Sequence, residues 1–143
     1  MKRVAFVFPG QGSQEVGMGK ALYETYDEVK DLFEQADEEL EVPLTKLMFD
    51  GPQDELTKTE HAQPALLINS AAIVSLLEKE GIEPVMTAGH SLGEYSALVA
   101  SKALKPLEAA ALVQKRGQLM DHGSCVRAGS GCNPERFGRY EGR

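Results

Sequence analysis

"TAGHSLGEYSAL" occupies residues 87–98 and contains the pattern GxSxG as Gly89, Ser91 and Gly93. The residues before this pattern are typical of a strand, and the residues after it are typical of a helix. A GxSxG serine lies on the sharp turn between such a strand and helix, where the glycines leave room for a crowded backbone. The stretch therefore predicts a turn that exposes the Ser91 hydroxyl at the carboxyl end of a strand.

The chemistry expected of this turn is nucleophilic attack on a carbonyl carbon. The backbone amide of Leu92, at the amino end of the following helix, can donate a hydrogen bond to the oxyanion that such an attack produces. The helix dipole adds positive potential at the same place. The alternative is that Ser91 only caps the helix, which is a common role for serine. Its position between a predicted strand and a predicted helix favours the nucleophile.

The segments on both sides of this turn alternate in an α/β order. The apolar run RVAFVF at residues 3–8 predicts a buried strand of a parallel sheet, and EPVMTAGHS at 83–91 predicts a second strand with its turn. Apolar periodicity and proline starts predict helices at 19–40, 64–81, 92–103 and 106–121. Residues 41–63 read as a connection with one helical turn near 44–48. This order predicts an α/β fold with a parallel sheet flanked by helices.

Composition and charge limit the class of protein. The chain has 143 residues, 42% hydrophobic and 26% charged, which fits one globular domain. A formal net charge of −7 argues against binding nucleic acid or an anionic membrane through bulk charge. The first apolar run ends at Pro9, too early for a signal peptide or a membrane span, so we expect a cytoplasmic protein. Cys125 and Cys132 have no partner pair, so no metal site is expected.

The charge and the amino-acid composition of the chain change near residue 121. Residues 1–121 carry 11 basic and 20 acidic side chains, whereas residues 122–143 carry four arginines and two glutamates. The second segment also holds five of the 14 glycines and shows neither helical nor strand periodicity. We therefore expect a domain over residues 1–121 and a disordered tail over residues 122–143.

The glycines of PGQGSQEVGMGK, residues 9–20, do not form a phosphate-binding loop. The GxGxxG spacing fails at Glu15 and the Walker spacing fails at Gln14, so nucleotide binding is not supported. A glycine-rich loop after the first strand of an α/β sheet can instead bring a backbone N–H toward the carboxyl edge, where ligands gather. Gln11 is then the candidate for a second oxyanion donor.

Several motifs in register resemble one enzyme family. FVFPGQGSQ with GMG, QPAL, GHSLGEYSAL and RGQLM are similar to the malonyl-CoA:acyl carrier protein transacylases of fatty acid synthesis, from residue 3 to about 121. The resemblance implies an acyltransferase core with the carrier protein and malonyl-CoA as partners, and no cofactor besides this substrate. It also implies a ping-pong reaction in which Ser91 holds a malonyl ester before the carrier thiol collects it.

The same resemblance implies roles for four further residues. The backbone amides of Gln11 and Leu92 would form the oxyanion hole. Arg116 matches the arginine that binds the free carboxylate of malonate, for which a planar guanidinium is suited; without the motifs it reads as a solvated charge near a helix end. Gln63 matches a position that lines the pocket, although a glutamine before Pro64 is also typical of an exposed helix start.

The base that should activate Ser91 is missing from the matching positions. In the family it is a histidine far downstream, whereas His61, His90 and His122 of this chain do not match it. We expect His90 to point away from the serine and transacylase activity of this chain to be negligible. The loss of resemblance near His122 favours a frameshift in the gene, with an early stop or a cloning artefact as alternatives. Without further strands, the sheet should keep an unpaired edge and uncovered apolar faces.

Two other functions fit parts of the sequence. A serine esterase or thioesterase of the α/β-hydrolase type also uses GxSxG, but Arg116 and the PGQGSQ loop argue against it. A fragment without catalytic activity that binds acyl carrier protein is the third possibility. Such a fragment would still bind after Ser91→Ala and would form no acyl-enzyme.

Overall fold

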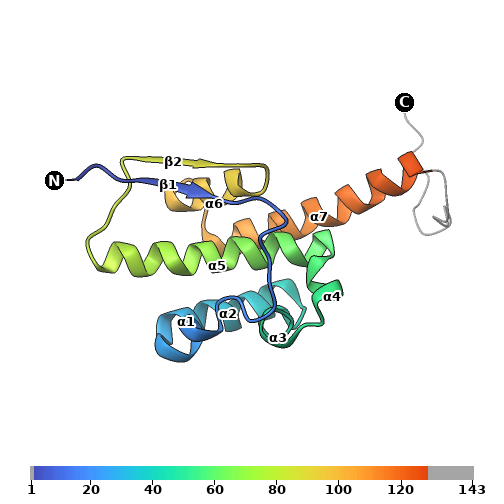
Figure 1. Cartoon of the computed structure of the whole chain (residues 1–143), viewed down its shortest axis with the longest axis horizontal. Coiled ribbons are helices and arrows are strands. Elements are labelled where there is room, and N and C mark those ends of the chain that lie inside the picture. The colour runs from blue at the N-terminus through green and yellow to red at the C-terminus, as the bar shows by residue number, and fades with distance from the viewer. Residues whose placement is uncertain (1, 129–143) are drawn as a thin grey trace.

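Strands and helices alternate along the chain in the computed structural model, which describes the backbone of residues 2–128 and the side chains of residues 2–121. The elements are β1 (Ala5–Phe8), α1 (Lys20–Thr25), α2 (Asp27–Leu40), α3 (Leu44–Asp50), α4 (Gln53–Thr57), α5 (Thr59–Lys79), β2 (Met86–Gly89), α6 (Gly93–Ala100) and α7 (Pro106–Ala128). Figure 1 shows the strands on one side of α5 and helices α1 to α4 on the other. The long helix α5 therefore forms the middle layer.

The two strands pair in parallel, as the α/β pattern predicts. Ala5 of β1 lies opposite Met86 of β2, and the register continues to Phe8 opposite Gly89. Parallel pairing requires a long crossover, which the helices α1 to α5 provide. Because the carboxyl ends of both strands meet at one edge, the loop after β1 and the GxSxG turn after β2 lie side by side. The expected α/β class is confirmed.

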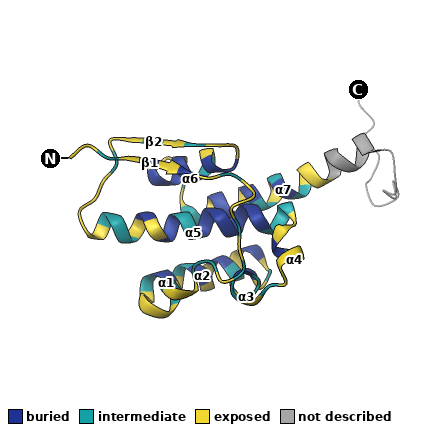
Figure 2. Cartoon of the chain, viewed as in Figure 1, coloured by how far each residue is buried: buried dark blue, intermediate teal, exposed yellow. Residues whose placement is uncertain are grey.

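The main core lies around α5, whose middle is buried on most sides (Figure 2). Leu67 and Ile68 of α5 have no exposed surface, and Phe33 of α2 and Val113 of α7 pack in the same cluster. A second, smaller cluster joins the covered face of the sheet to α5 and α6. A helix that is apolar nearly all round needs neighbours on every side, and α5 packs against α2, α6, α7 and the covered face of the sheet.

The sheet is covered on one face only, which agrees with the expected uncovered apolar face, and the strand expected to be buried is buried on its other face alone. Phe6 and Phe8 point into the smaller cluster, whereas Val7 is 77% exposed and Met86 of β2 is 67% exposed. Figure 2 accordingly shows exposed residues along both strands. An apolar run is ambiguous in this respect, because it records that the strand is hydrophobic and not whether a second layer is present.

The helix expected over residues 19–40 is two helices. Tyr26 has an extended backbone between α1 and α2, and its side chain is 43% exposed. The Thr25 hydroxyl donates to the carbonyl of Ala21, and Asp27 and Glu28 give α2 an acidic first turn that suits a new helix start. The apolar stripe from Val29 onward is buried as expected, because it belongs to α2 alone.

The helix expected to begin at Pro64 begins earlier, at Thr59, so Pro64 lies inside α5. The preceding connection is also more helical than expected, because α3 and α4 occupy most of it. Proline is disfavoured inside a helix since it lacks an N–H and crowds the carbonyl four residues earlier. Here the first turn of α5 packs against α7, and this tertiary contact outweighs the local preference.

The last helix extends past Asp121, the end that the sequence predicts, and α7 continues to Ala128. Gly123 lowers helix propensity by about 1 kcal/mol, yet no proline interrupts this segment. Residues 129–143, including Cys132, lie outside the described residues, as does the side chain of Cys125, so the predicted disorder there is not tested. Among the described helices, none combines the length and the apolar character that crossing a bilayer requires.

Candidate active site

The GxSxG turn has the geometry that its sequence predicts. β2 ends at Gly89 and α6 begins at Gly93, with Ser91 exposed between them. The φ angle of Ser91 is 51°, in the left-handed region that side chains other than glycine rarely adopt. Such a conformation costs on the order of 1–3 kcal/mol and persists only where its surroundings impose it. The strained serine is therefore a candidate functional residue on conformational grounds alone.

The two glycines of the motif are required by close backbone contacts. A Cβ atom on Gly89 would lie 2.0 Å from the carbonyl carbon and oxygen of Gly93. A Cβ atom on Gly93 would lie 2.3 Å from the carbonyl oxygen of Phe8. Any side chain at either position would push α6 away from the strands. The pattern thus determines how closely the helix after Ser91 approaches the sheet.

Arg116 connects Ser91 to Gln63. Its Nη2 donates to the Ser91 hydroxyl oxygen at 3.1 Å, and its Nη1 donates to Oε1 of Gln63 at 2.7 Å. The Gln63 side chain has no exposed surface, and its Nε2 donates to the sulfur of Met120 at 3.2 Å. A buried amide hydrogen-bonded at both ends is a rigid support. Three residues from α5, α7 and the turn after β2, far apart in sequence, therefore meet at one point.

Gly117 explains how Arg116 and Gln63 come within reach of one another. A Cβ atom on Gly117 would lie 2.6 Å from the carbonyl oxygen of Thr59 and 2.7 Å from the Cα of Glu60. The missing side chain lets α7 pack directly on the first turn of α5. That close crossing aligns Arg116 with the buried face of α5, where Gln63 lies one turn further on. The alternative of an exposed Gln63 at a helix start is excluded, because this residue is fully buried.

The guanidinium of Arg116 also lies over the ring of Tyr95 in α6. Its central carbon is 5.4 Å from the ring centroid. A cation in this position is attracted by the face of the ring, by about 0.5–1 kcal/mol at a partly exposed site. Arg116 is thus held from three sides, by Gln63, Ser91 and Tyr95. The side chain is a half-buried, oriented cation and not the freely solvated charge of the alternative interpretation.

The loop after β1 contacts the GxSxG turn. A Cβ atom on Gly10 would lie 2.9 Å from the carbonyl oxygen of His90, so the two segments touch. The neighbouring Gln11 donates its side-chain Nε2 to the Thr59 hydroxyl at 3.0 Å, which ties the loop to α5. Neither the amide of Gln11 nor that of Leu92 is hydrogen-bonded within the part of the chain that the structure describes.

Among the described side chains, no histidine is hydrogen-bonded to Ser91. Nδ1 of His61 lies 2.9 Å from the carbonyl oxygen of Glu55, between α4 and α5. The ring of His90 packs toward the loop after β1, where its Nδ1 would be 3.0 Å from a Cβ atom on Gly10. The side chain of His122 lies outside the described residues.

Sequence reasoning missed two residues that position the site. Tyr95 lies in the first turn of α6, just after the GxSxG turn, but no local signal marks it as the partner of Arg116, which belongs to α7. Thr59 falls in the segment that the sequence indicates to be a polar connection, and no local signal marks it as the partner of Gln11. Its contact arises only because the first turn of α5 extends back to residue 59.

Strand, strained serine and helix, with a fixed arginine beside the serine, define an α/β domain that has a GxSxG turn at the carboxyl edge of its sheet. The model of the acyl transferase domain family matches residues 5–134, and the chain belongs to this family. The match runs past Asp121, where we expected the resemblance to end, and reaches residue 134.

Relatives of known name are similar over the same range. The malonyl CoA-acyl carrier protein transacylase of Bacillus subtilis strain 168 is 53% identical over 131 residues, which are 92% of this chain and 41% of that protein. The crystal structure of an acyl carrier protein S-malonyltransferase from Vibrio cholerae is 50% identical with a TM-score of 0.78, covering 82% of this chain and 39% of that one.

A third relative is described as a malonyl-transacylase in complex with a type II PKS acyl-carrier protein. It is 43% identical with a TM-score of 0.80, and the alignment covers 85% of this chain and 40% of that one. The chain therefore spans about two fifths of the length of the relatives that it matches.

Proposed function

We propose that this chain is the nucleophile-bearing part of a transacylase that moves a malonyl group from malonyl-CoA to acyl carrier protein. The observation that carries the proposal is the guanidinium of Arg116, held 3.1 Å from the hydroxyl oxygen of Ser91 by the buried Gln63. An acyl group with a free carboxylate needs a fixed cation at a short distance from the attacked carbonyl. The names of the relatives support malonyl as that acyl group.

The proposed reaction has two transfers at Ser91. The serine oxygen attacks the thioester carbonyl, the C–S bond breaks, and coenzyme A leaves as the thiol once it receives the serine proton. The thiol on acyl carrier protein then attacks the seryl ester, the C–O bond breaks, and the proton returns to Ser91. The net reaction exchanges one thioester for another, so it consumes no further cofactor.

The malonyl carboxylate would be bound by Arg116. A guanidinium has five N–H donors, and the contacts to Gln63 and Ser91 engage two of them. The remaining N–H groups can donate hydrogen bonds to both oxygens of a carboxylate, a bidentate geometry that lysine cannot provide. Gln63 and Tyr95 would keep the plane of the guanidinium oriented, which makes them positioning residues.

The oxyanion of both transfers would be stabilised by the amides of Leu92 and Gln11. Leu92 immediately precedes α6, so its N–H lies at the positive end of the helix dipole, which favours a developing negative charge. Gln11 lies next to Gly10, which contacts the turn, and its side chain is tied to Thr59. One donor of this kind contributes roughly a hundred- to a thousandfold in rate.

The proposal places the protein in the cytoplasm, with acyl carrier protein as its macromolecular partner. A net charge of −7 disfavours nucleic acid and anionic membranes as alternatives.

The isolated chain should nevertheless acylate itself extremely slowly. Neither His61 nor His90 is hydrogen-bonded to Ser91, and removal of the base from the serine nucleophile of a protease such as subtilisin lowers the rate by on the order of a millionfold. Intact-mass spectrometry after incubation with malonyl-CoA measures the seryl ester directly. Rapid acylation of the purified chain would contradict the prediction.

The function itself is tested in a chimera. Residues 1–121 replace the matching part of the Bacillus subtilis transacylase, and malonyl transfer from malonyl-CoA to acyl carrier protein is measured together with the acyl-enzyme. We expect transfer by the chimera and no seryl ester after Ser91→Ala. A folded chimera without an ester at Ser91 would overturn the proposal.

Arg116→Lys in the same chimera tests the carboxylate site. A charged hydrogen bond is worth about 1.5–3 kcal/mol, so malonyl transfer should fall by about tenfold or more. The slow reaction with acetyl-CoA, which has no carboxylate, should change little. Lys115→Ala, an exposed lysine beside Arg116 in α7, is the matched control. Equal losses with both thioesters would exclude Arg116 as the carboxylate ligand.

A further inference from the structure

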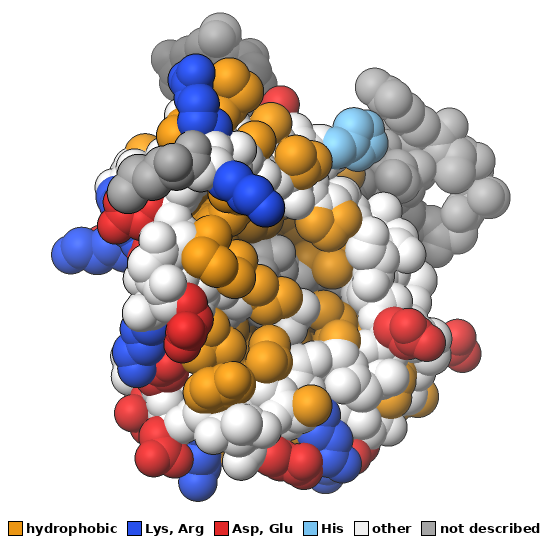
Figure 3. Space-filling model, turned by 60° about the vertical axis from the view of Figure 1, so that its left-hand side comes forward, with side chains coloured by type: hydrophobic (Ala, Val, Ile, Leu, Met, Phe, Trp, Pro, Cys, Tyr) orange, Lys and Arg blue, Asp and Glu red, His pale blue; other side chains and the backbone are white. Residues whose placement is uncertain are grey.

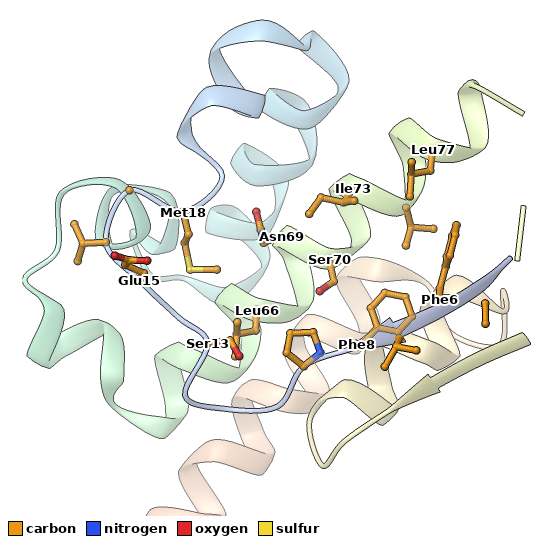
Figure 4. A pocket seen from close by; sticks show the side chains of 16 residues that line it. Phe6, Phe8, Ser13, Glu15, Met18, Leu66, Asn69, Ser70, Ile73 and Leu77 are labelled. Carbon is orange, nitrogen blue, oxygen red and sulfur yellow. The ribbon is translucent and has the colours of Figure 1, made fainter. Parts of the chain in front are cut away.

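A groove of about 680 Å³ lies between β1 and α5. Figure 4 shows its walls, which are β1, the loop over residues 13–18 and one side of α5. Figure 3 shows a face of the molecule on which hydrophobic side chains surround a hollow and charged side chains lie mainly at the rim. Ser91, Gln63 and Arg116 do not line the groove. Selection of the acyl group therefore depends on the surroundings of Arg116 instead.

Met120, the last residue of the RGQLM motif, contacts Gln63 but has no part in the proposed reaction. Its sulfur accepts a hydrogen bond from Nε2 of Gln63 at 3.2 Å, although the Met120 side chain is 43% exposed. Met120 follows Arg116 by four residues, about one turn of α7, so the two side chains lie on the same face of the helix. That face holds the Gln63 amide at both ends, with Arg116 at its oxygen and Met120 at its nitrogen.

The two ends of the Gln63 amide need partners of opposite kinds. A guanidinium donates hydrogen bonds and cannot accept them, so Arg116 binds the amide through its oxygen. The NH₂ group then needs an acceptor on its other side, because a donor without a partner is costly in a fully buried side chain. A thioether sulfur accepts and does not donate, so it pairs with the NH₂ group and not with the oxygen. Met120 therefore favours the amide orientation that Arg116 needs.

Other side chains at position 120 would not discriminate in this way. A hydroxyl, amide or ammonium group could donate to the Gln63 oxygen, and the amide would then turn its NH₂ group toward the Arg116 cation, which has no acceptor for it. An aliphatic side chain would leave the NH₂ group unpaired and so favour conformations in which Gln63 is no longer buried. A thioether suits a half-buried position because it is largely apolar and still a weak acceptor.

We propose that Met120 is a positioning residue of the carboxylate site, because it fixes the orientation of the Gln63 amide and, through it, the guanidinium of Arg116. The contacts run from Met120 to Gln63, from Gln63 to Arg116 and from Arg116 to Ser91. Met120 thus acts on the malonyl carboxylate through two other side chains and favours acyl groups that have a carboxylate. This inference rests on the proposed function, since it adds a residue to the same site.

Met120→Leu tests the proposal in the transacylase chimera that carries residues 1–121. Leucine keeps the size and apolar character of methionine, which cores usually tolerate, and removes the acceptor. We expect KM for malonyl-CoA to rise by about three- to tenfold while kcat stays within about twofold of the parent. KM for acetyl-CoA, which has no carboxylate, should not change. A general loosening of α7 would instead affect both thioesters equally.

Two further variants show whether Met120 acts through Gln63. Leu119→Ala is the matched control, because Leu119 is the neighbouring residue of α7 and is 58% exposed. It should leave both KM values within about twofold of the parent. Gln63→Ala should itself raise KM for malonyl-CoA, and the addition of Met120→Leu to Gln63→Ala should then have no further effect, because the two residues share one pathway.

Crystal structures of the parent chimera and its Met120→Leu variant test the positioning role without reference to the reaction. We expect the Gln63 side chain to change conformation in the variant and the contact between Arg116 and Ser91 to lengthen or break. A chimera that shows this displacement but transfers no malonyl group would support the role of Met120 and contradict the proposed function alone.

Three outcomes would overturn the role of Met120. One is a KM for malonyl-CoA that Met120→Leu leaves unchanged, with Gln63 in its original position. Another is an equal loss of activity with malonyl-CoA and acetyl-CoA. The third is an effect of Met120→Leu that persists in full in the Gln63→Ala background, which would mean that Met120 does not act through Gln63.

Discussion

Val113 and Val7 are the same residue type in opposite surroundings. Val113 of α7 has no exposed surface and packs in the core around α5, whereas Val7 of β1 is 77% exposed beside the groove. Both lie in segments whose sequence is apolar, and neither segment differs from a core element by local pattern. The difference is in their neighbours, because α7 has α5 and α2 against it while the outer face of β1 has no covering layer in the described residues.

This comparison shows where the candidate site gets its rigidity. We call the fully packed region around α5, where α7 and α2 cover it, the closed side of the molecule. It holds Arg116, Gln63 and Gly117, and Ser91 lies where this region joins the sheet. The nucleophile turn can therefore be in place although one face of the sheet is open. Stability should accordingly depend strongly on the closed side and the covered face, and weakly on the open face.

Gly89→Ala is expected to have the largest effect on this arrangement. The added Cβ would lie 2.0 Å from the backbone of Gly93, so α6 must move away from the strands. We expect a loss of about 3 kcal/mol in the free energy of unfolding, the upper end for overpacking. Urea unfolding followed by circular dichroism measures it.

Gly12→Ala separates this clash from backbone strain. Gly12 has a φ of 113°, but a Cβ atom there would meet nothing within 4 Å. The expected cost is about 1 kcal/mol from the left-handed backbone alone. Equal losses for the two variants would mean that α6 does not pack tightly on the sheet in solution.

Val113→Ala and Val7→Ala give the most direct measure of the difference between the two regions. Removing two methyl groups from the fully buried Val113 should cost about 2 kcal/mol, through lost burial and the cavity that remains. The same change at the exposed Val7 should stay within about 0.5 kcal/mol. Both are measured by urea unfolding at neutral pH. Similar small losses at both positions would show that the α5–α7 core is loosely packed.

Asp37→Asn is expected to have the smallest effect and concerns a polar position on the closed side. Burial raises the pKa of the Asp37 carboxyl, although its Oδ1 accepts a hydrogen bond from the Thr45 amide at 2.8 Å, which acts in the opposite direction. Because this pKa is higher in the folded than in the unfolded chain, the native state binds the proton more tightly. The contribution of Asp37 to stability therefore grows as pH falls through the window between the two pKa values.

Asparagine keeps the acceptor and cannot ionise. Relative to Asp37→Asn, the parent should therefore gain stability as the pH is lowered across that window, and the variant should be at least as stable as the parent at neutral pH. Urea unfolding of both proteins over a pH series measures this difference. A parent that loses stability relative to the variant on acidification would contradict burial as the dominant cause.

The sequence predicted the structure best where a close backbone contact allows only one residue type. GHSLG predicts the turn, the strand before it and the helix after it, because only glycine tolerates the contacts at positions 89 and 93. Arg116 was named from the resemblance to the transacylases, and the structure adds that Gly117 beside it permits the close crossing of α5 and α7. The turn could be predicted because few residue types satisfy such steric constraints.

Element boundaries were predicted less well. The break at Tyr26 and the start of α5 at Thr59, ahead of Pro64, are set by packing against other helices. Tyr95 and Thr59 were likewise missed as supports of the site, because their partners Arg116 and Gln11 are brought to them by the fold.

Local residue patterns were enough to predict the α/β order and the turn at Ser91, since each depends on the steric and chemical properties of a few neighbouring residues, whereas Arg116 was named only from the resemblance to a family. Burial of Gln63, the orientation of Arg116 and the open face of β1 depended on which segments meet in space. An apolar strand has the same sequence whether one or both of its faces are covered. Its surroundings are a property of the whole packed molecule, and so they followed from the tertiary structure.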